Sequence, residues 1–109
     1  MTEQGRKYLV DILQAIELVN SFLEGIDSFG QYEVDLKTQS AIERQLGIIG
    51  EAVNKFQKEC PGEKLENTHH IVGFRNRIIH AYDSIDNSIV WVIIKKHLTP
   101  LKQEVEHKI

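Results

Sequence analysis

The chain has 109 residues, the size of one domain with a single modest core, so we expect one domain over residues 1–109. With 41% hydrophobic and 27% charged residues, the composition is that of a folded protein and excludes disordered and fibrous classes. The net charge of −3 argues against a broad, sequence-independent grip on nucleic acid, so any such site must be local.

Membrane and disulfide chemistry are also not expected. No apolar run approaches the roughly 20 residues that span a bilayer, and the N-terminus lacks the basic-then-apolar order of a signal peptide. We therefore expect a cytoplasmic protein without membrane contact. Cys60 is the only cysteine, so one chain can form neither an intrachain disulfide nor a cysteine-based metal cluster.

The first half of the chain predicts two long helices and a short turn between them. Apolar residues at helical spacing indicate an amphipathic helix from Arg6 to Glu24. Ser28 and Gln31 form a capping-box pattern that opens a short turn. Asp35 is the expected N-cap of a helix over residues 36–59, which Pro61 and Gly62 terminate.

Four residues inside this second long helix stand out. Gly47 and Gly50 each cost about 0.5–1 kcal/mol relative to alanine, so we expect a close-packed neighbouring helix to compensate. Arg44 and Glu51 are seven positions apart and share an edge away from the core stripe. They are either solvated charges or supporting residues of a site.

The second half predicts two more helices. Asn67 or Thr68 can cap a third helix, which should fray near Tyr82. Residues 89–94, IVWVII, could alone be a buried strand. N-cap candidates at positions 86 and 88, and apolar residues at helical spacing to the C-terminus, favour a helix, in which Pro100 implies a kink or a restart.

Four main helices without a strand pattern predict an all-α, antiparallel bundle of four to five helices. The last helix is apolar well outside its core stripe, at Ile89, Trp91 and Val92. A small bundle has few ways to bury such a helix on several sides, so we expect a homodimer. His97 lies within the same apolar arc and is expected to be a core or interface histidine.

The third helix carries a polar motif, GFRNRIIHAYD, at residues 73–83. Arg75 lies near the centre of an apolar arc, where a permanently charged guanidinium needs an anionic partner or a wet cleft. Structural pairing and a functional anion site are both open, with Glu51 as the partner in either case. Arg77 points elsewhere and is an exposed charge or a secondary phosphate contact.

His80 does not share the face of Arg75. Five residues of regular helix rotate it by about 140°, whereas Asn76 falls on the side of His80. Either the helix loosens before His80, or both residues reach one cleft at a subunit boundary. A cap or packing role remains the alternative for His80, and a packing role for Tyr82.

These side chains suit metal-independent RNA cleavage. An imidazole that titrates near neutrality can take a proton from a ribose 2′-OH or donate one to the leaving 5′-oxygen. An arginine can hold the phosphate and stabilise its developing charge. A neighbouring amide can orient either group.

The order Arg75, Asn76, His80, Tyr82 resembles the signature of HEPN ribonucleases, and specifically of HepT-like toxins. The similarity extends over nearly the whole chain, through RKYLVDILQAIELVNSFLEG, AIERQLGIIGEAV, GFRNRIIHAYDSID and VWVIIKKHLTPLK. One departure is residues 67–70, NTHH, where relatives often carry a Pro-Trp pair before the motif helix.

The resemblance implies a homodimer whose two motifs line a shared cleft and which cuts RNA, such as tRNA or mRNA, without a metal or cofactor. It makes Arg75 and His80 the catalytic pair, assisted by Asn76. It also implies a toxin–antitoxin pair, in which an MNT-type nucleotidyltransferase attaches AMP to Tyr82. That modification places bulk and negative charge beside the catalytic pair.

Two other functions are possible. The resemblance to HEPN proteins also allows a non-catalytic module that binds a nucleotide or presents a substrate to a nucleotidyltransferase. The other is a zinc site built from His69, His70 and His80, which is poorly supported because adjacent histidines on a helix diverge and no fourth ligand is nearby.

Overall fold

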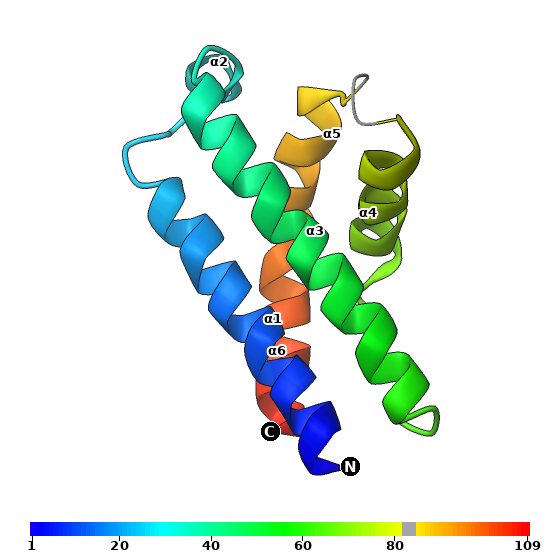
Figure 1. Cartoon of the computed structure of the whole chain (residues 1–109). Coiled ribbons are helices and arrows are strands. Elements are labelled where there is room, and N and C mark those ends of the chain that lie inside the picture. Colours follow the sequence, from blue (N-terminus) through cyan, green and yellow to red (C-terminus); the bar gives the residue numbers. More distant parts are fainter. Residues whose placement is uncertain (82–84) are drawn as a thin grey trace.

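The computed structural model describes residues 1–81 and 85–109. Its elements are α1 (Glu3–Phe22), α2 (Phe29–Glu33), α3 (Leu36–Glu59), α4 (His69–Ala81), α5 (Asn87–Val92), the π-helical turn η2 (Ile93–His97) and α6 (Leu98–Lys108). α1 and α3 lie side by side and run in opposite directions, α4 flanks α3, and the α5–η2–α6 rod runs behind them (Figure 1). Helices account for all regular secondary structure in the described ranges, which confirms the all-α bundle.

Local capping fixes the helix boundaries in the first half. Thr2 accepts a hydrogen bond from the Gly5 N–H at 2.9 Å, so α1 begins at Glu3. The predicted start at Arg6 was wrong for this reason, and α1 ends at Phe22 rather than at residue 24. The capping box of Ser28 and the N-cap at residue 35 are both confirmed, and α3 has the predicted bounds.

The short helix α2 covers the top of the core. The Gln39 side-chain amide donates to the backbone carbonyls of Tyr32 and Glu33, each at 2.9 Å, and ties α2 to α3. Tyr32 and Phe29 then pack on Trp91, with ring centroids 5.6 and 6.2 Å apart. The side chain of Trp91, which lies outside the core stripe of the last helix, is thus partly covered within the chain. Val92 stays 42% exposed.

The last predicted helix forms one helical run with a widened turn. The Leu98 N–H donates to the Ile93 carbonyl, five residues back, as a π-turn requires. Pro100 has no N–H, and its ring crowds the carbonyl four residues before it, at Lys96. The expected disturbance at Pro100 therefore takes the form of a π-turn just upstream.

The core is centred on α3. Its fully buried stripe is the predicted one, Ile42, Leu46, Ile49, Val53 and Phe56. It packs against buried residues of α1, α4 and the last helices, with Leu9, Ile12, Ile71, Phe74, Leu101 and Val105 among them. None of the helices within the described ranges is long and apolar enough to cross a bilayer.

A carboxylate anchors the loop that leads into α4. Glu104 of α6 accepts hydrogen bonds from the backbone N–H groups of Glu66 and Asn67, at 2.8 and 3.1 Å, and from the Asn67 side-chain amide at 3.0 Å. Burial raises the pKa of Glu104, but these hydrogen bonds together outweigh burial and lower it. The start of α4 is therefore held by α6.

Candidate active site on helix α4

Helix α4 crosses α3 at a glycine. A Cβ built on Gly50 would lie 2.6 Å from the Arg75 Cβ and 3.3 Å from the Ile71 carbonyl oxygen, so only glycine permits this approach. A Cβ on Gly47 would lie 3.8 Å from the Ile78 side chain, an ordinary contact. The predicted close-packed neighbour is confirmed at Gly50, while Gly47 has no such need.

Arg75 lies in the apolar stripe of α4, as the helical spacing of the motif predicts. It lies in the inward stripe of α4, between buried Ile71 and half-buried Ile78. Its aliphatic stem packs on Gly50, and the guanidinium continues outward, where it donates to the Asn76 Oδ1 at 3.3 Å. The Arg75 side chain therefore has a buried aliphatic stem and a positively charged guanidinium at the surface.

Arg75 lines a cleft of about 320 Å³ between α3 and α4. Arg44 and Glu51 line the same cleft, so the structure brings these two sequence-predicted residues together with Arg75. Glu51 forms its ion pair with Lys55 at 3.2 Å, one turn along α3, and not with Arg75. Glu43 also lines the cleft, and burial raises the pKa of its carboxyl group.

His80 lies elsewhere on the same helix. It is exposed, and it does not line the cleft that Arg75 enters. Because α4 continues through His80 to Ala81, the alternative in which the helix loosens before His80 is wrong. Asn76 lies between them, since it is hydrogen bonded to Arg75 and shares the helical side of His80. Tyr82 lies outside the described residues.

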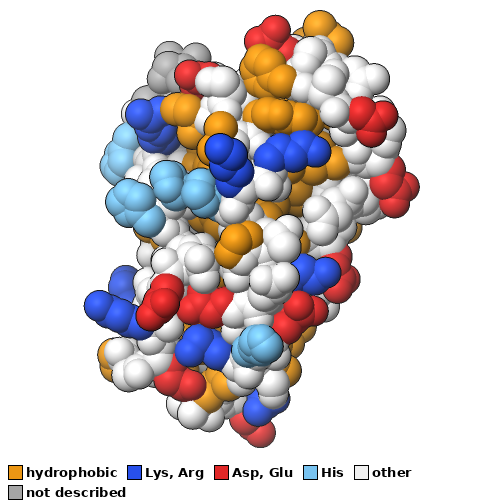
Figure 2. Space-filling model, turned by 180° about the vertical axis from the view of Figure 1, so that it is seen from behind, with side chains coloured by type: hydrophobic (Ala, Val, Ile, Leu, Met, Phe, Trp, Pro, Cys, Tyr) orange, Lys and Arg blue, Asp and Glu red, His pale blue; other side chains and the backbone are white. Residues whose placement is uncertain are grey.

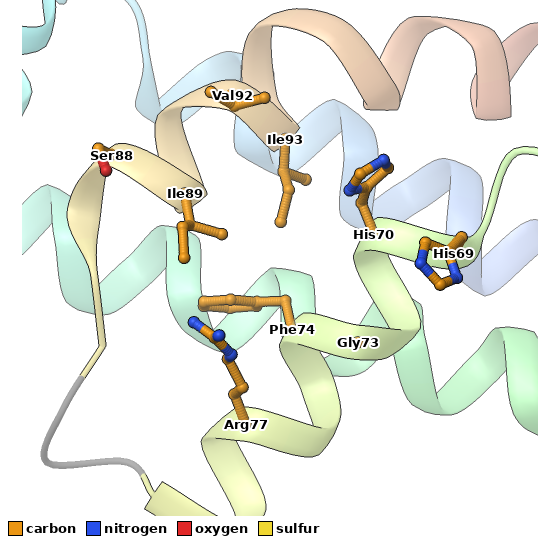
Figure 3. Close-up of a pocket in the computed structure, with 9 residues that line it drawn as sticks. All are labelled: His69, His70, Gly73, Phe74, Arg77, Ser88, Ile89, Val92 and Ile93. Carbon is orange, nitrogen blue, oxygen red and sulfur yellow. The ribbon is translucent and has the colours of Figure 1, made fainter.

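A second hollow, about 450 Å³, separates α4 from α5 and η2. Figure 3 shows Ile89 and Ile93 projecting toward the Phe74 ring, with Arg77 reaching the same space from α4. The sequence indicated that Arg77 is an exposed charge or a secondary phosphate contact, but it did not predict this groove. The available signal was Gly73, a glycine inside the motif helix.

Histidines gather beside this groove. The His70 ring stacks on His97 with centroids 3.9 Å apart and planes at 19°, and His69 meets His70 edge-on at 5.4 Å. Burial, with smaller contributions from His70 and Lys96, lowers the pKa of His97. His97 is thus a packing histidine within one chain. Within residues 1–81 and 85–109, no three metal-binding side chains converge, and His80 does not join His69 and His70.

Comparison with known proteins agrees with this architecture. Residues 12–107 match the family described as "Ribonuclease HepT-like". A Thermococcus cleftensis protein named "Probable ribonuclease HepT" is 34% identical, over 97% of this chain and 96% of its own. Proteins named "Putative RNase" from Methanocaldococcus jannaschii and Caldanaerobacter subterraneus subsp. tengcongensis are 33% and 36% identical, over 93% of this chain and 93% and 90% of theirs.

No solved structure matches the chain. The family match covers most of the sequence, including helices α3 and α4 that carry Arg75 and its cleft. The relatives match this chain over almost their whole lengths, so the similarity is not confined to a motif. The chain therefore belongs to the HepT-like ribonuclease family.

Proposed function

We propose that this chain is a metal-independent endoribonuclease that acts as the toxin of a toxin–antitoxin pair. The observation that carries the proposal is the placement of Arg75 and His80 on one uninterrupted helix, with Arg75 held at its base by Gly50. His80 is exposed and free to meet a substrate. The two residues then act across a cleft that two subunits form.

In this mechanism His80 exchanges protons with the RNA. A ribose 2′-oxygen attacks the adjacent phosphorus as its proton leaves to a base, and the 5′-oxygen departs with a proton from an acid. The products are a 2′,3′-cyclic phosphate and a 5′-hydroxyl end. Arg75 holds the phosphate oxygens and stabilises their developing charge, while the hydrogen bond to Asn76 fixes the guanidinium.

One exposed apolar side chain beside the proposed site supports assembly into a homodimer. Ile79, on the motif helix, is 51% exposed. It lies on the rim of the cleft that contains Arg75, so an apolar contact with a partner would adjoin that cleft. A partner subunit seated there would bring its own His80 toward this cleft.

The cleavage mechanism is tested with purified protein, single-stranded RNA and excess EDTA. We expect wild-type protein to leave 2′,3′-cyclic phosphate ends, and His80→Ala and Arg75→Ala each to lose at least about 100-fold in rate. His107→Ala, at an exposed histidine of α6, is the matched control and should cleave normally. Intact RNA with wild-type protein, or equal cleavage by His80→Ala, contradicts the mechanism. Nucleotide binding without cleavage would instead indicate a non-catalytic module.

We further propose that an MNT-type nucleotidyltransferase neutralises the toxin. The Tyr82 hydroxyl attacks the α-phosphorus of ATP, pyrophosphate leaves, and AMP stays attached through a phosphodiester bond. The added negative charge near Arg75 and His80 then repels the RNA backbone. After co-expression, mass spectrometry should find AMP on Tyr82, and none in Tyr82→Phe, whereas Tyr8→Phe is modified normally. An inhibited but unmodified chain contradicts this mode of control.

A further inference from the structure

Gly73 is a glycine that packing does not explain. It is exposed near the middle of α4, where glycine weakens a helix relative to alanine. A Cβ at this position would meet no atom within 4 Å, in contrast to Gly50. Gly73 does line the groove between α4 and α5. Glycine at such an open position lets a bound molecule approach the backbone.

The groove has the build of a small-molecule site. Its volume of about 450 Å³ lies within the range of about 300 to 1,000 Å³ that is typical of ligand pockets. Phe74, Ile89 and Ile93 form an apolar floor, and the nitrogen-bearing side chains of Arg77 and His70 stand at its two ends (Figure 3). Bases bind to apolar and aromatic surfaces of this kind.

The charge of the groove is opposite to that of the whole chain. None of the nine described residues that line it is acidic, although the net charge of the chain is −3. Asp86 is an acidic residue near Arg77. Its carboxylate accepts hydrogen bonds from the Ser88 N–H and hydroxyl at 2.8 and 2.6 Å, and these bonds, with a smaller contribution from the charge of Arg77, lower its pKa. Figure 2 shows histidines and Lys or Arg side chains gathered around exposed hydrophobic atoms on this side of the molecule.

We propose that this groove binds one unpaired nucleotide of the RNA substrate. The base lies on the floor formed by Ile89 and Ile93, and the phosphate pairs with Arg77. His80 is three residues beyond Arg77 and is its neighbour on the surface of α4, so one strand can occupy the groove and continue toward His80. The inference rests on the ribonuclease function proposed above and adds a substrate subsite to it.

Filling the groove tests the inference. In a His80→Ala background, which keeps RNA intact, fluorescence anisotropy measures binding of a labelled, unstructured RNA of about 12 nucleotides. Gly73→Leu should weaken binding about tenfold or more, because the new side chain occupies the space of the base. Gly73→Ala adds only a methyl group, so it should weaken binding far less than Gly73→Leu. Gly62→Leu adds the same side chain to an open site in the loop after α3.

Charge removal is an independent second test. Arg77→Gln should weaken RNA binding and lower its salt dependence by about one counterion, while Arg6→Gln on α1 makes the same charge change away from the groove. Gly73→Leu should melt no lower than wild type, since it removes a glycine from a helix. If neither Gly73→Leu nor Arg77→Gln weakens binding relative to its control, the subsite is wrong.

The subsite and the ribonuclease function fail differently. If wild-type protein cleaves RNA and Gly73→Leu cleaves at the rate of Gly73→Ala, the function stands and the subsite is overturned. If wild-type protein neither cleaves nor binds RNA, the function itself fails. Sedimentation of each variant identifies the remaining case: if Gly73→Leu dissociates a dimer, a second copy of the chain occupies the groove and the nucleotide site is wrong.

Discussion

At the scale of single residues, the stacked histidines make stability depend on pH. His97 is partly buried against the ring of His70 of α4, with ring centroids 3.9 Å apart. Burial disfavours the charged imidazole of His97 and lowers its pKa, and His70 and Lys96 add smaller contributions in the same direction. The folded state therefore favours neutral His97.

This gives a prediction with a defined sign. The pKa of His97 is lower in the folded state than the value of about 6.5 expected when unfolded. Stability is therefore complete above that value and is lost as the pH falls through it, because the unfolded chain binds the proton more readily. Between about pH 7.5 and 5.5, the Tm of His97→Gln should fall by less than the Tm of the wild-type protein. An equal loss of Tm in both proteins contradicts the prediction, and His107→Gln is the control.

At the scale of elements, the two glycines of α3 have different roles. Gly50→Ala should destabilise the fold by about 1–3 kcal/mol, because its Cβ overlaps the stem of Arg75 and α4 must move away. Gly47→Ala meets only the Ile78 side chain at 3.8 Å and should stabilise α3 by up to about 1 kcal/mol. Urea unfolding midpoints measure both, and equal effects would contradict the distinction.

The sequence predicted most elements because their signals are local. Periodicity and side-chain caps determine α3 to the residue, and the core stripe of α3 follows from the same pattern. Long-range contacts carried no such signal. The anchoring of the Asn67 loop by Glu104 joins residues 37 positions apart, and the stack of His70 on His97 joins two helices that only folding brings together.

The site was predictable to a similar extent. The apolar setting of Arg75 and its separation from His80 follow from helical geometry. That Arg44 and Glu51 share its cleft required the packing of α4 on Gly50. The groove beside Gly73 depends on where α5 lies relative to α4. No local sequence pattern encodes that position.

At the scale of the whole molecule, the separation of Arg75 and His80 predicts complementation between subunits. In a symmetric dimer with Arg75 from one chain and His80 from the other, a mixed dimer of Arg75→Ala and His80→Ala retains one intact site. Random mixing should restore about one quarter of wild-type cleavage, although each variant alone is inactive. The rate is measured after co-refolding the two chains. Mixed dimers that stay inactive would place both residues in the same chain's site.

The π-turn at Ile93–His97 determines where the α5–η2–α6 rod tolerates a change in length. A π-turn holds about one residue more than an α-helical turn, so it accommodates one additional residue while the two ends of the rod keep their faces. Deleting one residue there should restore a plain α-helix, with Ile89 still at the groove and Leu101 still in the core. The π-turn is therefore the place in the rod where a residue can be removed without rotating the side chains that line the groove.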